Sequence, residues 1–169
     1  MVLAIWWSPL KKGWVKLKTD GVVSYFSNCT LVGGVFRDVD TRWLCGFSLA
    51  VVKKTIFRAE ARTMLEGFRI AWEKGFRQLE LEYDNALLVE TLLAGRVTNS
   101  SLVELRLINC IFRRTWKIRR RHIPKNQNAI ANQMAKYINN GTPNLLLFID
   151  PPSLLQRVLQ FENNAFTRI

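Results

Sequence analysis

Three acidic residues of this chain stand where a carboxylate could do chemistry. Asp20 closes a segment of alternating apolar and polar residues, and Asp84 closes a second such segment. Glu60 lies near the beginning of a segment with helical spacing. Carboxylates that converge repel one another unless they share a cation, and Mg²⁺ prefers hard oxygen ligands of this kind. If the fold brings the three together, they form a divalent-metal site suited to phosphodiester hydrolysis.

The same acids also have an ordinary structural explanation. A glutamate in the first turn of a helix is stabilised by the helix dipole, and aspartates at the ends of strands are often simply solvated. Acids are scarce in the chain, 13 against 25 lysines and arginines, which makes their positions informative. Spacing alone leaves both interpretations open.

The elements around these acids predict an open α/β sheet. Alternating polarity predicts a meander of three antiparallel strands, over residues 14–20, 31–37 and 42–51. Residues 57–74 carry apolar side chains at helical offsets, and Gly75 is expected to end that helix.

Residues 78–84 alternate again and predict a fourth strand. A strand, a helix and a second strand in this order form a crossover, so this strand should run parallel to a neighbour, which we expect to be the first strand. Sites in open sheets form beyond the carboxyl ends of parallel strands. Asp20 and Asp84 are therefore expected to meet there, with Glu60 reaching down from the helix.

The remaining elements complete the order β-β-β-α-β-α-α-β-α. We expect helices at 88–93, 101–113 and 127–139 and a cationic fifth strand at 116–123. We divide the chain into one domain over residues 1–140, with its core at about 13–140, and a C-terminal appendage over 141–169. The appendage contains the Pro151-Pro152 break and a short amphipathic piece, and it is expected to pack on the domain.

Several spaced motifs together resemble a known family. They are Gly-Trp-Val-Lys-Leu-Lys-Thr-Asp-Gly (13–21), Gly-Gly-Val-Phe-Arg-Asp (33–38), Ala-Glu-Ala (59–61) with Gly-Phe-Arg-Ile-Ala-Trp (67–72), and Gly-Phe-Arg-Gln-Leu-Glu-Leu-Glu-Tyr-Asp (75–84). In this order they resemble plant type 1 ribonuclease H-like domains, which occur in non-LTR retroelement proteins and in reverse-transcriptase-associated chains. The resemblance covers nearly the whole chain.

The resemblance implies a fold and an activity. The fold is α/β and ribonuclease H-like, a five-stranded mixed sheet of three antiparallel strands and then two parallel ones, flanked by helices. The activity is endonucleolytic hydrolysis of the RNA strand of RNA–DNA hybrids by two-metal-ion catalysis. Two Mg²⁺ or Mn²⁺ ions are implied, held by an Asp-Glu-Asp-Asp set whose first three positions match Asp20, Glu60 and Asp84.

The fourth acid of that set is missing, because Asn132 stands in its place. No Asp or Glu occurs between Glu104 and Asp150 that could substitute for it. Asn132 keeps a carbonyl oxygen but lacks the charge, so we expect it to be a weakened fourth ligand and one of the two ions to bind more weakly. The chain is accordingly either an impaired nuclease or a module that binds hybrids without cutting them.

His122 is the only histidine. The resemblance places it at the position of a mobile histidine beside the metals, where it would relay a proton, and Asn128 at the asparagine that follows. A lone histidine is more often structural, so both roles stay open.

Basic residues indicate where a nucleic acid would lie. A cationic run from Arg113 to Lys125 contains no acid, and it leads directly to His122. Such a run can be a solvated sheet edge, but we favour a surface that follows the phosphates and positions a duplex without reading its bases. The residues expected to contact nucleic acid are Lys18, Gly21, Arg58, Arg119, Arg121, Lys125 and Asn128.

Bulk properties agree with an intracellular partner of nucleic acid. The formal charge of +12 favours a polyanionic partner. The three cysteines, spaced far apart, form neither a zinc signature nor a disulfide framework. The sequence shows no signal peptide, no membrane span and no motif for a small-molecule cofactor. We expect a nuclear or cytosolic protein, which can be part of a longer reverse-transcriptase polypeptide.

Three functions therefore compete. The first is a metal-dependent ribonuclease acting on RNA–DNA hybrids, impaired by Asn132. The second is a degenerate module that binds hybrid or structured nucleic acid without cutting. The third is a generic basic RNA-binding protein, whose binding would depend on salt but not on Asp84 or on metal.

Overall fold

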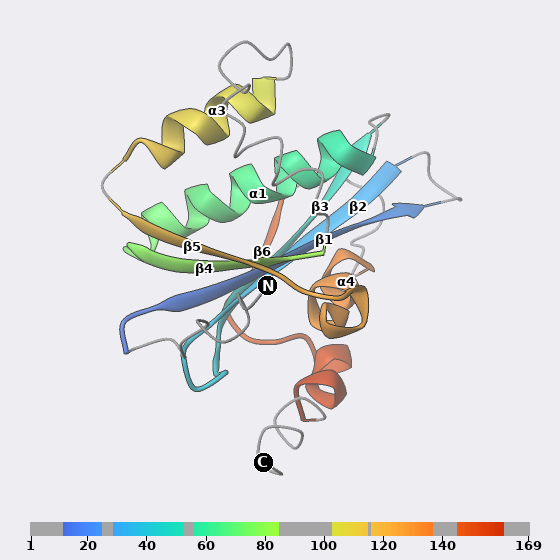
Figure 1. The fold of residues 1–169 in the computed structure, drawn as a ribbon. Helices are drawn as coiled ribbons and strands as arrows, with labels where there is room; N and C mark the ends of the chain where they lie inside the picture. Colours follow the sequence, from blue (N-terminus) through green and yellow to red (C-terminus); the bar gives the residue numbers. More distant parts are fainter. Residues whose placement is uncertain are drawn as a thin grey trace, which may run out of the picture.

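The computed structural model describes residues 12–24, 29–52, 56–84, 103–114, 116–136 and 145–160. A twisted sheet forms the middle layer of the molecule. Helices α1 and α3 cover one face of this sheet, and α4 covers the other (Figure 1). This is the layered α/β arrangement that the sequence predicts.

The sheet has six strands in the order β5-β4-β1-β2-β3-β6. The bounds of its strands are β1 Val15–Ser24, β2 Cys29–Arg37, β3 Trp43–Val52, β4 Gln78–Tyr83, β5 Lys117–His122 and β6 Leu146–Phe148. Strands β1, β2 and β3 form the expected antiparallel meander. Strand β4 runs parallel to β1, and β5 runs parallel to β4, as predicted.

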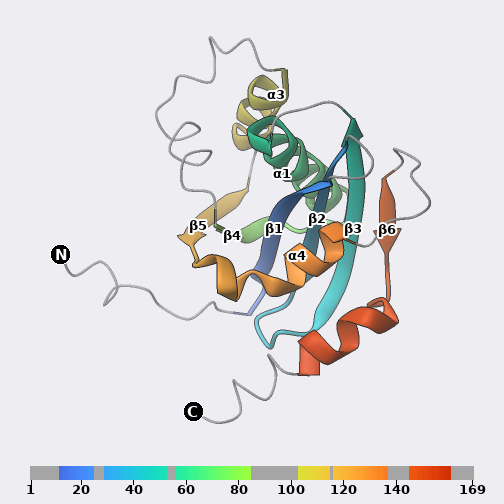
Figure 2. The same cartoon turned by 90° about the vertical axis from the view of Figure 1, so that its right-hand side faces the viewer.

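The sixth strand corrects the predicted count of five. Leu146–Phe148 comes from the C-terminal segment and pairs antiparallel with the outer edge of β3 (Figure 2). Three apolar residues are too few to show a strand period in the sequence. The segment expected only to pack on the domain therefore extends its sheet, while the division at residue 140 stays a prediction.

Helix α1 (Ile56–Glu73) spans the sheet on the face that buries Leu17 and Leu81. Its inward side chains are those that the periodicity predicts, and they include the buried Met64 and Phe68. Gly75 follows the helix with φ at 81°. The N–H of Phe76 bonds to the carbonyl of Ala71, and that of Gly75 to the carbonyl of Trp72. This pair of bonds is a Schellman motif, which stops the helix where predicted.

Helix α4 (Ala129–Lys136) lies against the opposite face of the sheet. Its Ile130 and Met134 pack on Val35 of β2. A Cβ added at Gly33 would lie 2.4 Å from the backbone nitrogen of Ala135, so only glycine allows helix and strand to approach this closely. A short 3₁₀ turn, η3 (Lys125–Gln127), leads from β5 into this helix.

The other described elements lie at the edges of the molecule. Helix α3 (Val103–Phe112) packs on α1, and the turn η4 (Ser153–Leu155) packs beside α4. The helix expected at 88–93 and the end of the one expected at 127–139 lie outside the described residues. Among the helices that are described, none has both the length and the apolar character needed to cross a bilayer.

Candidate metal centre and nucleic-acid interface

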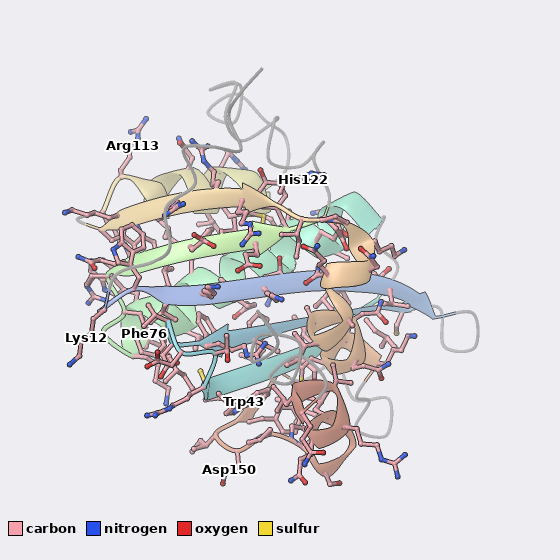
Figure 3. All side chains as sticks on the ribbon, turned by 60° about the horizontal axis from the view of Figure 1, so that its bottom comes forward. Lys12, Trp43, Phe76, Arg113, His122 and Asp150 are labelled. Carbon is pink, nitrogen blue, oxygen red and sulfur yellow. The ribbon has the colours of Figure 1, made fainter. Side chains whose placement is uncertain are left out.

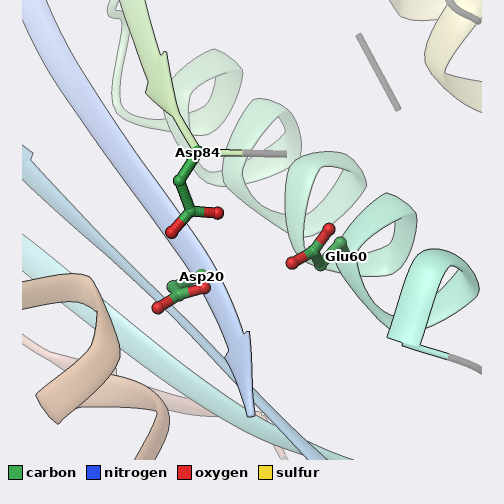
Figure 4. Close-up of side chains that lie close together, drawn as sticks. All are labelled: Asp20, Glu60 and Asp84. Carbon is green, nitrogen blue, oxygen red and sulfur yellow. The ribbon is translucent and has the colours of Figure 1, made fainter. Parts of the chain in front are cut away.

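The structure brings Asp20, Glu60 and Asp84 together. They come from β1, from α1 and from the residue after β4, and their carboxylates converge in Figure 4. One carboxylate oxygen from each residue can be chosen so that the three lie within 4.8 Å of one another. They line a small pocket together with Thr19, Thr63, Met64 and Tyr83. Among the described residues this is the only group of three or more potential metal ligands with that geometry.

The strand pairing explains why the acids can meet. Parallel pairing of β1 with β4 is recorded only up to Lys18 opposite Glu82, so Asp20 and Asp84 each follow the last pair by two residues. The sequence pattern predicted that Asp20 ends its strand. This was wrong, because β1 continues to Ser24 in antiparallel pairing with β2. The strand that stops is β4, and Asp84, which follows it, lines the same pocket as Asp20 and Glu60.

Asp20 is buried, with 4% of its surface exposed. Its Oδ1 accepts a hydrogen bond from the backbone N–H of Gly21 at 2.9 Å. Burial raises the pKa of Asp20, and the negative charge of Asp84 adds to this, while the hydrogen bond from Asn132 and the charge of Lys125 act in the opposite direction. A buried carboxylate whose ionised form is disfavoured gains from a cation, which is the behaviour expected of a metal ligand.

Asn132 lies beside Asp20, where the family resemblance places a fourth ligand. Its side-chain nitrogen donates a hydrogen bond to Oδ2 of Asp20 at 3.1 Å. The amide therefore presents its donor to the acidic cluster, and this hydrogen bond stabilises the Asp20 carboxylate where a cation would otherwise do so.

Asn128 lies inside the protein, with no exposed surface. Its side-chain nitrogen donates to the backbone oxygen of Thr19 at 2.7 Å and to Oδ2 of Asp84 at 3.3 Å. Among the described residues its own Oδ1 has no hydrogen-bond partner. The sequence favoured Asn128 as a nucleic-acid contact. In the structure it is buried and donates a hydrogen bond to Asp84 from the interior of the protein.

His122 lies at the exposed rim of the site, at the end of β5. Its Nε2 is 3.0 Å from the backbone oxygen of Asp84, to which it donates in the tautomer protonated at Nε2. The imidazole ring also lies 5.7 Å from the ring of Tyr83. The histidine thus contacts the backbone of one residue of the cluster and lies on the solvent side of the site.

Three of the cations expected to contact nucleic acid lie against acids of the protein itself. Arg58 pairs with Glu104 of α3 at 3.3 Å. Arg119 lies 3.3 Å from the fully buried Glu80. Lys18 lies 3.9 Å from Glu82, which is also buried.

The other expected contacts lie nearer the open side of the site. Lys125 is exposed in η3, and Arg121 is partly exposed opposite Glu82 in the register of β4 and β5. Gly21 lies beside Asp20 and is partly exposed. Arg113 lies toward the other end of β5 from His122 (Figure 3). The cationic run therefore extends away from the acids along β5 instead of surrounding them.

A ladder of charges crosses β1, β4 and β5, and the sequence alone did not predict it. Lys16 lies opposite Glu80 and Lys18 opposite Glu82, while Arg119 and Arg121 flank the same two glutamates from β5. The signal was present as alternating cations and acids in three segments. It could be used only once the register between those segments was known.

Comparison with known proteins agrees with this fold. A family model described as "Reverse transcriptase-like" matches residues 18–138, which is most of the chain. The chain belongs to this reverse transcriptase-like family. The Arabidopsis thaliana protein named "Putative ribonuclease H protein" is 34% identical over 164 residues, 96% of this chain. The chain spans only 26% of the length of that relative.

Solved structures show the same fold at lower identity. The N-terminal ribonuclease H domain of a Mycobacterium tuberculosis protein superposes with a TM-score of 0.64 at 21% identity, covering 73% of this chain and 91% of that one. A metagenomic ribonuclease H1, LC11, solved in complex with an RNA/DNA hybrid, gives 0.62 at 20% identity and covers 71% and 92%. This member of the reverse transcriptase-like family therefore has a ribonuclease H fold.

Proposed function

We propose that this protein is a divalent-metal-dependent endonuclease that hydrolyses the RNA strand of RNA–DNA hybrids. The observation that carries the proposal is the convergence of Asp20, Glu60 and Asp84 from three separate elements. Family membership supports it, since a relative of the chain is named as a ribonuclease H protein. The complex of the LC11 enzyme with a hybrid supports the class of substrate.

The three carboxylates fit a divalent ion by their chemistry. They are hard oxygen donors gathered in one pocket, and burial raises the pKa of Asp20, so a bound cation would stabilise its ionised form. Asp20, Glu60 and Asp84 would hold Mg²⁺ or Mn²⁺. Asn132, whose nitrogen faces Asp20, would be the weakened fourth ligand only through its side-chain oxygen. Two ions, one of them weakly held, would activate the attacking water and stabilise the leaving oxygen of the phosphodiester.

The protein's own residues would orient the reaction. Asn128 holds Asp84, and both Gly21 and Asn132 hold Asp20, so two of the three acids are fixed before any substrate binds. His122 lies at the solvent side of the cluster, where its ring could accept or pass on a proton as water attacks the RNA strand in line.

Cations beside the site would position the duplex. Lys125 is exposed and its charge acts on Asp20, and Arg121 is partly exposed on β5. Contacts of this type hold phosphates without reading bases. Recognition of RNA in the cut strand would come from contacts to 2′-hydroxyl groups.

The plant retroelement origin, a longer reverse-transcriptase polypeptide and a nuclear or cytosolic location stay predictions. The relative's greater length is consistent with the second of these.

Cleavage of an end-labelled RNA–DNA hybrid tests the proposal. We expect cuts in the RNA strand with Mg²⁺ or Mn²⁺, no cuts in EDTA, and no cuts in RNA–RNA or DNA–DNA duplexes of the same sequence. Asp20→Asn should lose the activity, whereas Asp40→Asn in an exposed turn should keep it. Cleavage by the wild type that does not exceed that of Asp20→Asn would reject a nuclease function.

One observation favours a second candidate, a module that binds hybrids without cutting them. The Asn132 amide already donates a hydrogen bond to Asp20, so the Asp20 carboxylate is partly stabilised without a metal. This candidate expects hybrid binding that survives in EDTA and no cleavage at any metal concentration. The same assay, run beside a binding measurement, separates the two functions.

A further inference from the structure

Lys18 has two partners within the protein. Its ammonium lies 3.9 Å from Oε2 of Glu82 on β4 and donates a hydrogen bond to the backbone oxygen of Gln127 at 3.1 Å. Only 13% of its side chain is exposed. A lysine that contacts phosphate needs a free, accessible ammonium. The ammonium of Lys18 instead contacts the buried Glu82 and the backbone of Gln127.

The bond to Gln127 matters because it holds the turn that leads into the two asparagines of the site. Gln127 is the last residue of η3, and Asn128 comes next. Asn128 holds Thr19 and Asp84 with its side chain, and its backbone oxygen accepts the N–H of Asn132 at 3.1 Å. Asn132 in turn holds Asp20. One hydrogen bond from Lys18 therefore lies at the start of a chain of contacts that reaches both aspartates.

The side chains of η3 itself do not anchor it, although the buried Ile123 lies shortly before it. None of its three residues is buried, and Pro124 before it is exposed as well. An exposed turn that buries no side chain of its own opens more easily than the buried elements on either side of it. Lys18 and the buried amide of Asn128 fasten it to the sheet from adjacent points.

Glu82 explains why a lysine can occupy this position. Its carboxylate is buried on β4, and among the described residues its Oε1 has no hydrogen-bond partner. A buried carboxylate needs a neighbouring cation, which Lys18 and Lys16 provide at 3.9 and 3.8 Å. Glu82 thereby keeps the Lys18 ammonium against the sheet and within reach of η3.

We propose that Lys18 is a positioning residue, which fastens η3 to the sheet so that Asn128 and Asn132 hold Asp84 and Asp20 in place. The consequence for metal binding rests on the proposed function, but the effect on the two asparagines does not. Lys18 then serves the site through the protein and makes no contact with phosphate.

Lys16 offers a matched control for the test. It lies on the same strand, has 14% of its side chain exposed, and faces the same Glu82 carboxylate at 3.8 Å. It is two residues farther from Asp20, and no hydrogen bond from it to η3 is observed in the described structure. Lys16→Met and Lys18→Met thus remove the same charge beside the same acid, and only the second removes the bond to Gln127.

The experiment compares these variants by NMR of the full chain without metal and by Mn²⁺ titration. In Lys18→Met we expect the side-chain amide signals of Asn128 and Asn132 to shift and their hydrogen exchange to accelerate. We also expect Mn²⁺ affinity to fall by about tenfold, the lower end of what loss of an outer-shell contact costs. Lys16→Met should leave both measurements near wild type, and Lys18→Arg should restore them. Should Lys18→Met fail to fold, Lys18→Gln takes its place with the same expectation.

Two outcomes would overturn the proposal. If both lysine variants change the asparagine signals equally, the charge beside Glu82 matters and the bond to Gln127 does not. If Lys18→Met leaves those signals unchanged but weakens hybrid binding and its salt dependence, Lys18 is a phosphate contact. A wild type that binds Mn²⁺ but cuts no hybrid would refute the nuclease function alone, because the amide signals are measured without substrate.

Discussion

The side-chain nitrogen of Asn132 lies 3.1 Å from Oδ2 of Asp20 and donates a hydrogen bond to it. An aspartate at position 132 would instead face Asp20 with a second negative charge. The two side chains differ by a single group, yet one relieves the charge of the cluster and the other increases the need for a cation. The identity of residue 132 is therefore the most informative single difference from the ligand set that the family resemblance implies.

Asn132→Asp tests whether this difference limits activity. Four carboxylates attract divalent ions more strongly than three, so we expect tighter Mn²⁺ binding and a gain in hybrid cleavage of about tenfold or more, equivalent to roughly 1.4 kcal/mol in the barrier. Without metal, the variant should be less stable than wild type because a buried hydrogen bond becomes a repulsion. Cleavage rates and thermal unfolding in EDTA measure the two effects.

Gln133→Glu is the matched control, because Gln133 is the next residue of the same helix and its side chain is exposed. It likewise converts an amide to a carboxylate, but it adds the charge away from the cluster and should change neither measurement. An Asn132→Asp variant with wild-type cleavage would mean that three acids suffice or that the site is limited elsewhere.

Metal should stabilise the folded protein. An ion bound only by the native state adds about 2.7 kcal/mol to the free energy of unfolding when its concentration is about 100 times the dissociation constant. We expect Mg²⁺ or Mn²⁺ to raise the unfolding temperature of wild type, and Asp84→Asn to lose this increase because it removes one of the three ligands. Asp40→Asn should retain the increase. Calorimetry with and without EDTA measures it, and equal gains in all three proteins would place the ion elsewhere.

Glu80 should make stability depend on pH. Burial raises its pKa, the charge of Glu82 adds to this, and Lys16, Arg119 and Arg121 act in the opposite direction. A carboxyl whose pKa is higher in the folded than in the unfolded state binds its proton more tightly when folded. Ionisation of Glu80 therefore lowers the free energy of unfolding, and the full reduction is present above the pKa of Glu80 in the folded state. The free energy of unfolding rises again as the pH falls from that pKa toward the pKa of the unfolded state.

Glu80→Gln isolates that contribution because it resembles the protonated acid at every pH. We expect the variant to be more stable than wild type at neutral pH and the difference to shrink as the pH is lowered through the raised pKa. Denaturant unfolding across that range measures the difference, and Glu73→Gln on the exposed end of α1 controls for the change in net charge. A variant that is less stable than wild type at neutral pH would show that the pair with Arg119 outweighs the cost of burial.

Lys125 should contribute to hybrid binding through a phosphate. It is exposed in η3, close enough for its charge to act on Asp20. Lys125→Ala should weaken binding similarly for all sequences and reduce the slope of log affinity against log salt by about 0.9, the value for one phosphate contact. Lys117→Ala, at the other end of β5, should have a smaller effect. Equal losses would place the duplex along the whole strand.

Local patterns in the sequence predicted most of the fold. Residues close together in the chain determine the period of α1, its end at Gly75 and the succession of strands along the chain. Even the meeting of Asp20 with Asp84 followed from a connection rule, since a strand–helix–strand crossover makes β4 parallel to its neighbour. The sixth strand was missed because Leu146–Phe148 is too short to show a period.

Only the tertiary structure decided which partners the charged and amide side chains have. The sequence by itself determined that Lys18, Asn128 and Asn132 lie in or close to the motifs that resemble the ribonuclease H-like family. It could not distinguish a side chain that contacts phosphate from one that contacts another part of the protein. That choice depends on register and on distances of a few ångströms between residues far apart in the chain, such as Lys18 and Gln127. Periodicity carries no such information, because a hydrogen bond forms only where packing brings a donor to an acceptor.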